Sequence, residues 1–212
     1  MNARQSLIAG GSIEDRSGVV RLSRSRIVRL ETTLAAALLT AAFVWSWFRG
    51  LALASHLRIT TLDLVTGFGA AAILCLSLPF LTSTWASRVL VLREMKGVWD
   101  DVLAPLGKSL DLREITILAV FSGLSEEIFF RGVLQAEVGI VAASLLFGLL
   151  HPLNLSYVIW AASVGFAFGL LYQMTGSLVP SILCHGAYNF AALLYLRYWY
   201  QEENRDHVLL AG

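Results

Sequence analysis

The sequence predicts an all-α fold, a polytopic integral membrane bundle of about six transmembrane helices. Hydrophobic residues make up 57% of the 212 residues and charged residues only 15%, whereas a soluble domain needs roughly a quarter of its residues charged. Several apolar stretches are long enough to cross a bilayer, whose hydrocarbon core takes about 20 residues of helix. The formal net charge is +1, which argues against nucleic acid as a partner.

Each predicted helix follows from one apolar stretch. Two charge-free runs predict the first two helices, and an apolar run that begins at Glu114 and has three charged residues in its interior predicts the third. Residues 138–196 contain no Asp, Glu, Lys or Arg, and proline, glycine and asparagine divide them into three further helices. The six predicted helices span residues 32–48, 64–87, 114–136, 138–151, 155–174 and 178–196.

The distribution of cationic residues predicts the orientation in the membrane. Residues 1–30 carry six arginines, and residues 88–113 carry five further cationic side chains. With an even number of helices, both stretches and the C-terminal tail lie on one side, which the positive-inside rule makes cytoplasmic. Residues 88–112 mix apolar and charged side chains and are predicted to form an interfacial helix and loop on that face.

The length suits a single membrane domain. We divide the chain into a basic cytoplasmic arm at 1–30, a transmembrane domain at 31–196 with a motif-bearing core at 114–196, and a tail at 197–212. Within the core, Gly165 and Gly169 have the GxxxG spacing that lets two membrane helices approach closely.

Three charged residues inside the third predicted helix are the first candidates for a functional site. A charge near the bilayer centre costs at least about 2.5 to 3.5 kcal/mol, so Glu126, Glu127 and Arg131 require a reason to be there. Glu127 and Arg131 are four residues apart, on one helical face, and are predicted to form an ion pair. Glu126 points about 100° away and has no local partner, as a general base requires. The alternative is a structural polar network that holds helices together.

Further polar residues in the last three helices favour a common pocket. His151 ends the fourth predicted helix, and His185 and Asn189 lie four residues apart on one face of the sixth. If these groups were buried separately, several would have no hydrogen-bond partner, whereas one shared pocket satisfies all of them. We therefore predict that they converge with the carboxylate of Glu126 in one cavity.

Three motifs in order carry a resemblance to a known family. The sequence has Glu126-Glu127 followed by Arg131 (EExxxR), then Phe147 and His151 (FxxxH), then His185 and Asn189 (HxxxN). Over residues 114–196 it resembles the CAAX prenyl protease and bacteriocin-processing (Abi) family of glutamate-dependent intramembrane endopeptidases. The predicted helix count differs from the eight spans of the members that act on prenylated proteins.

The resemblance implies a role for each of these residues. Glu126, helped by His151, would deprotonate a water molecule that attacks the peptide bond, and His185 with Asn189 would stabilise the oxyanion. Arg131 would hold Glu127, and Phe147 would support the site. No metal or other cofactor is implied. The implied partners are the lipid bilayer and a membrane-associated substrate, either the C-terminal tail of a protein or a precursor peptide, in a bacterial inner membrane.

Three alternatives remain open at this stage. Glu126, Glu127, His151 and His185 could instead form a zinc site of a metal-dependent membrane protease, although HExxH and HxxEH motifs are absent from the sequence. A non-catalytic scaffold or immunity protein could keep the same fold. A transporter is disfavoured, because we find no internal repeat.

Overall fold

The computed structural model describes residues 13–14, 20–21 and 23–200. Most of the predicted arm (1–30) and of the predicted tail (197–212) therefore lies outside the described residues. Two short strands, β1 (Ile13–Glu14) and β2 (Val20–Arg21), pair antiparallel before the first helix. All other elements are helical, as the predicted fold class requires.

The helices of the described residues divide into those of the bundle and those that connect them. The bundle consists of α1 (Arg24–Arg49), α2 (Thr61–Cys75), α3 (Ser77–Thr82), α6 (Leu112–Phe129), α7 (Gln135–Leu149), α8 (Leu155–Thr175) and α9 (Val179–Tyr198). The connecting helices are η1 (Leu53–Leu57), η2 (Ala86–Arg88), α4 (Leu90–Val98), η3 (Trp99–Leu103), α5 (Ala104–Ser109) and η4 (Phe130–Leu134). The predicted interfacial segment 88–112 is thus mainly helical.

All six predicted helices are present, although their ends differ. The first begins at Arg24 rather than at residue 32, because the arginine-rich turns continue the helix. The second begins at Thr61, where Thr60 and Asp63 form a reciprocal capping box. It ends at Thr82 instead of residue 87, after an interruption at Leu76 that separates α2 from α3.

No loop separates the third and fourth predicted helices in the structure, yet the chain reverses its direction between them. Five segments of the described residues are long and apolar enough to span a membrane, and the one at Leu112–Leu149 has 38 residues. A straight helix of that length would measure about 57 Å, nearly twice the hydrocarbon core. Gly139 breaks it with a φ of 79°, a conformation that glycine adopts without steric cost. The break lies close to the boundary predicted from the sequence.

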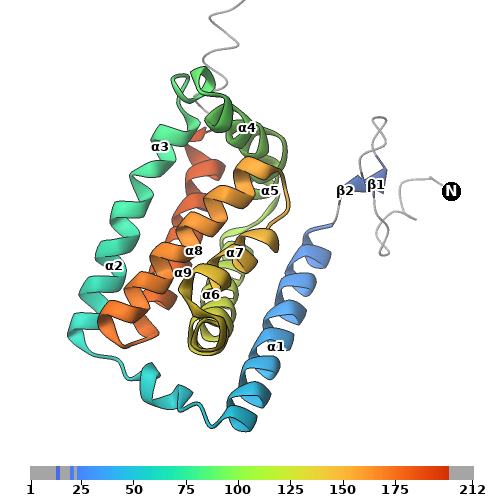
Figure 1. Ribbon diagram of the computed structural model, residues 1–212. Helices are drawn as coiled ribbons and strands as arrows, with labels where there is room; N and C mark the ends of the chain where they lie inside the picture. Colours follow the sequence, from blue (N-terminus) through green and yellow to red (C-terminus); the bar gives the residue numbers. More distant parts are fainter. Residues whose placement is uncertain (1–12, 15–19, 22, 201–212) are drawn as a thin grey trace, which may run out of the picture.

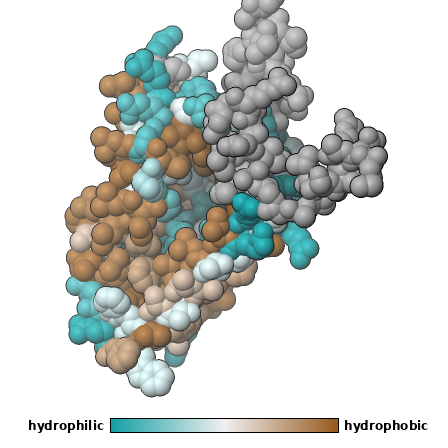
Figure 2. Space-filling view, turned by 90° about the vertical axis from the view of Figure 1, so that its right-hand side faces the viewer, coloured by the Kyte–Doolittle hydropathy of each residue, from teal (hydrophilic) through white to brown (hydrophobic). Residues whose placement is uncertain are grey.

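In Figure 1, α1, α6 and α8 run downward, whereas α2 with α3, α7 and α9 run upward, so α1 begins and α9 ends toward the same side of the bundle. This arrangement agrees with an even number of crossings. The outer surface is strongly apolar: Trp47 is 85% exposed and Ile73 is 72% exposed. Such side chains suit contact with lipid. The face in Figure 2 is largely hydrophobic, with a hollow in which hydrophilic residues are visible.

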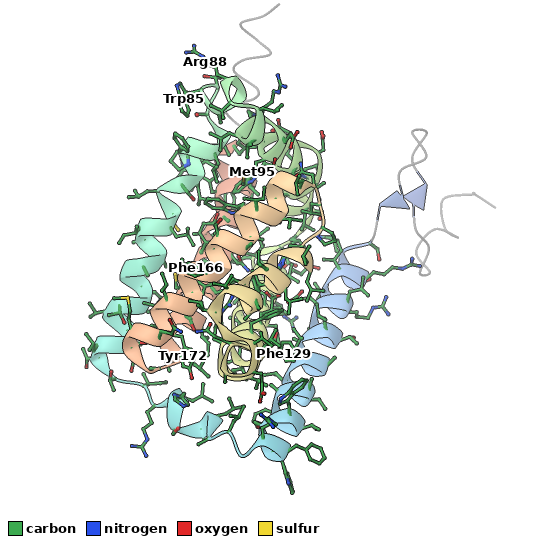
Figure 3. All side chains as sticks on the ribbon, in the orientation of Figure 1. Trp85, Arg88, Met95, Phe129, Phe166 and Tyr172 are labelled. Atoms are coloured by element: carbon green, nitrogen blue, oxygen red, sulfur yellow. The ribbon has the colours of Figure 1, made fainter. Side chains whose placement is uncertain are left out.

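Two apolar clusters lie toward opposite ends of the bundle. One joins α4 and η3 to the end of α9 and includes Met95, Trp99 and Leu196. The other includes Ile128 and Leu178, against which Phe129 and Tyr172 pack. Figure 3 shows Met95 near the upper end, and Phe129 and Tyr172 near the lower end. The polar residues singled out by the sequence are carried by α6 to α9, which pack against one another.

Candidate active site

The two helices that carry most of the site, α6 and α9, touch through their backbones. A Cβ atom added at Gly123 would lie 2.8 Å from the backbone nitrogen of Gly186, closer than real contacts allow. Only glycine fits there. This contact brings the face of α6 that carries Glu127 against the face of α9 that carries His185.

Glu127 is the centre of a buried ion cluster. Its side chain is 0% exposed, as is that of Arg131. The Nε atom of Arg131 donates to one oxygen of Glu127 at 3.2 Å, and Nδ1 of His185 donates to the other at 3.0 Å. The ion pair expected between Glu127 and Arg131 is therefore present, and His185 is a partner that the sequence did not indicate.

Arg131 lies in a π-helical turn, η4, a feature often found at functional sites. Its guanidinium lies 5.2 Å from the ring centroid of Phe147 and 5.8 Å from that of Phe130, at cation–π distances. A Cβ atom on Gly165 would lie 3.1 Å from its Nη2 atom. The predicted close approach at Gly165 thus places α8 directly against the arginine.

Glu126 differs from Glu127 in having a side-chain oxygen without a hydrogen-bond partner among the described residues. That atom, Oε2, is buried and lies 4.0 Å from Nε2 of His185. Because a carboxylate can only accept a hydrogen bond, Nδ1 of His185 carries its proton toward Glu127, and Nε2 faces Glu126. The imidazole therefore bridges the two adjacent glutamates.

His151 lies just beyond the end of α7, in the connection between two candidate spans. Its Nδ1 atom donates to the carbonyl oxygen of Phe147 at 2.7 Å, so Nε2 of the neutral ring is an acceptor. The ring packs against that of Phe147 with centroids 4.7 Å apart. Burial lowers the pKa of His151 below its ordinary value, which favours the neutral form.

The connection that holds His151 is fixed by α4. The side chain of Asn154 caps α8 by accepting from the backbone of Tyr157, and it donates to the backbone oxygen of Glu94 at 3.0 Å. The hydroxyl of Ser156 donates to the Glu94 carboxylate at 2.6 Å. The predicted interfacial segment thus positions a residue of the site.

Asn189 and two residues that the sequence analysis missed, Ser122 and Phe168, lie beside these groups. The amide nitrogen of Asn189 donates to the hydroxyl of Ser122 at 3.0 Å, which uses one of its two N–H groups. The ring of Phe168 stacks on His185 with centroids 4.9 Å apart. Ser122 could have been found from its position four residues before Glu126, on the same helical face. Phe168 has no distinguishing sequence pattern.

These side chains line one cavity of about 290 Å³. Its lining includes Glu126, His151, His185 and Asn189, as well as Glu31 from α1. The sequence analysis did not single out Glu31. In the part of the chain that the structure describes, no group of three or more His, Cys, Asp or Glu side chains is arranged to hold a metal ion. The arrangement suits proton transfer at Glu126 and hydrogen-bond donation from α9.

Comparison with known proteins agrees with the resemblance seen in the motifs. The family described as type II CAAX prenyl endopeptidase Rce1-like matches residues 108–191. An uncharacterized protein of Bacillus subtilis (strain 168), YpbD, is 32% identical over 99 residues, which cover 44% of this chain and 52% of that protein. The chain thus spans about half the length of this relative. None of the solved structures matches.

Proposed function

We propose that the protein is a glutamate-dependent intramembrane endopeptidase, which hydrolyses a peptide bond in a membrane-associated protein or peptide. One observation carries the proposal: Glu126, His151, His185 and Asn189 come from three separate segments and line the same cavity. The family match over residues 108–191 supports a protease of this class. Buried carboxylate and imidazole groups in one cavity can act as the proton donors and acceptors of general acid–base catalysis.

The reaction begins with a water molecule at Glu126. The carboxylate takes a proton from the water, and the oxygen attacks the carbonyl carbon of the scissile bond. His151 orients the water by accepting a hydrogen bond at Nε2, the atom left without a proton by the bond to Phe147. Collapse of the tetrahedral intermediate breaks the C–N bond, and Glu126 returns the proton to the leaving amine. Glu126 is thus first base and then acid.

Donors on α9 stabilise the negative oxygen of the intermediate. One N–H of the Asn189 amide donates to Ser122, which fixes the group and leaves the second N–H to donate to the oxyanion. Nε2 of His185 donates when the ring is protonated, and the carboxylate of Glu127 together with the oxyanion balances that charge. Donors fixed in advance cost no reorganisation during the reaction, which is why such groups accelerate acyl transfer. Arg131 acts by holding Glu127, and Phe147 acts by packing against His151 and Arg131.

The substrate reaches the cavity from the bilayer or from its surface, as a C-terminal tail or a precursor peptide. We place both termini of the chain in the cytoplasm, on the basis of the arginines near α1 and the cationic residues of 88–113. We place the protein in a bacterial inner membrane. The mechanism uses only side chains of the protein and a water molecule, without a metal or other cofactor.

The decisive experiment replaces Glu126 by Gln in the full-length protein, purified into lipid nanodiscs. The amide keeps the shape of the side chain but cannot accept the proton, so cleavage of a substrate peptide should fall by several orders of magnitude with little change in thermal stability. Asp101→Asn, which removes an exposed carboxylate outside the cavity, is the matched control and should cleave normally. Undiminished cleavage by Glu126→Gln would refute the proposal.

A further inference from the structure

Glu31 is a third carboxylate of the site, and it comes from outside the matched segment. It is half-buried on α1 and lines the same cavity as Glu126. Ala35, one turn further along α1, is completely buried, as is Ala42, so this face of α1 points inward, against α6. The match to the endopeptidase family begins at residue 108 and therefore assigns no role to Glu31.

Glu31 has no hydrogen-bond or ion-pair partner among the residues that the structure describes. A carboxylate in a partly apolar cavity is costly unless it is paired or serves a function. Its charge lies close enough to those of Glu126 and His185 to interact with both. The carboxylate is thus available at the wall of the cavity, within electrostatic range of the proposed catalytic residues.

The charges that line the cavity favour a cationic ligand. Glu31 and Glu126 contribute two carboxylates, while the basic groups are His151 and His185, and none of the described lining residues is Lys or Arg. Aromatic rings from η3 and α8 add to this preference, since a cation is attracted to the face of Trp or Tyr. The aromatic lining from these two elements includes Trp99, Tyr157, Trp160 and Phe168.

We propose that Glu31 is a specificity-determining residue, which pairs with a basic side chain of the substrate close to the scissile bond. This inference rests on the proposed endopeptidase function and names a property of its substrate: a Lys or Arg residue that enters the cavity together with the bond to be cleaved. The carboxylates of Glu31 and Glu126 line one cavity. The basic residue therefore lies only a few residues from the cleavage position.

The test uses sets of three quenched fluorescent peptides, which have Lys, norleucine or Glu at one position and are otherwise identical. Further sets move this position along the peptide on both sides of the cleavage site. The full-length protein in nanodiscs should prefer Lys over norleucine by about tenfold or more in kcat/KM at one position. In Glu31→Gln this preference should fall to near parity, and in Glu31→Lys it should shift toward the Glu peptide. Asp101→Asn should keep the preference.

Binding provides a second measurement that does not depend on turnover. In the Glu126→Gln background, the Lys peptide should bind more tightly than the norleucine peptide, and adding Glu31→Gln should remove the difference. Equal binding of all three peptides before Glu31 is changed, or a Lys preference that survives Glu31→Gln, would overturn the assignment of Glu31. The endopeptidase proposal would stand in that case, and it would fail separately if Glu126→Gln cleaved the peptides normally.

Discussion

Variants of the buried ion pair between Arg131 and Glu127 can separate its contribution to stability from its contribution to cleavage. We compare Arg131→Met, Glu127→Gln and the double variant with the unchanged protein. Methionine keeps much of the contact with Phe147, and glutamine keeps an oxygen that can accept from His185. The variants therefore remove charge with little change in volume.

The expected size follows from the burial of both side chains. Each is 0% exposed, and removing one partner of such a pair leaves a buried charge that costs about 3 to 5 kcal/mol. Each single variant should lose about that much free energy of unfolding. If the two effects were independent, the double variant would lose about 6 to 10 kcal/mol. We expect it instead to be no less stable than either single variant, because no unpaired charge remains.

The free energies are measured by unfolding each variant in mixed micelles with increasing SDS, and cleavage is measured on the same preparations. The double variant should recover stability but not activity, since the neutral His185 then lacks the carboxylate that favours its protonation while the oxyanion forms. The pair of Arg49 and Glu137 provides a control cycle, because Arg49 is 60% exposed and its coupling should be much smaller. Additive losses for Arg131 and Glu127 would refute the reasoning.

Three further predictions follow from the site. Gly123→Ala should lower the free energy of unfolding by about 1 to 3 kcal/mol and should also reduce cleavage strongly, because the added Cβ would push α6 away from Gly186. Gly69→Ala is the control in the same unfolding assay, since a Cβ at Gly69 would enter open space. Strong chelators should leave cleavage unchanged, whereas loss of activity that added zinc restores would establish the metal-dependent alternative. Because burial lowers the pKa of His151 from 6.5, the unfolded chain binds its proton more readily. The free energy of unfolding should therefore fall as the pH drops from about 6.5 through the lowered pKa of the folded protein. In His151→Gln this fall should be less steep, and thermal unfolding measured at a series of pH values tests the difference.

The sequence predicted the helices well because hydrophobic length is a strong constraint in a bilayer. The ends were harder to predict. The first helix was predicted to start at residue 32, where the charge-free run begins, yet it starts at Arg24. Glu31 consequently fell outside the predicted helix, and its position on the buried face of α1 could not be recognised.

The polar residues of the motifs were predictable for a different reason. A charged group inside an apolar helix is conspicuous, so Glu126, Glu127 and Arg131 could be identified without knowing their partners. Ser122 and Phe168 could not be identified in this way, because serine and phenylalanine are ordinary residues of membrane helices. The position of Ser122 on the helical face of Glu126 was a usable signal, whereas the contact of Phe168 with His185 follows only from the packing.

The different environments of the two adjacent glutamates arise from the contact between α6 and α9. Spacing alone pairs Glu127 with Arg131, but it leaves the second oxygen of Glu127 unassigned. Because Gly123 and Gly186 let the backbones meet, His185 reaches that oxygen with Nδ1 and turns Nε2 toward Glu126. Both oxygens of Glu127 are then engaged, while Glu126 keeps an unpaired oxygen. Of the two adjacent glutamates, the close helix contact thus leaves Glu126 with the unpaired oxygen, and this is the residue that we propose as the catalytic base.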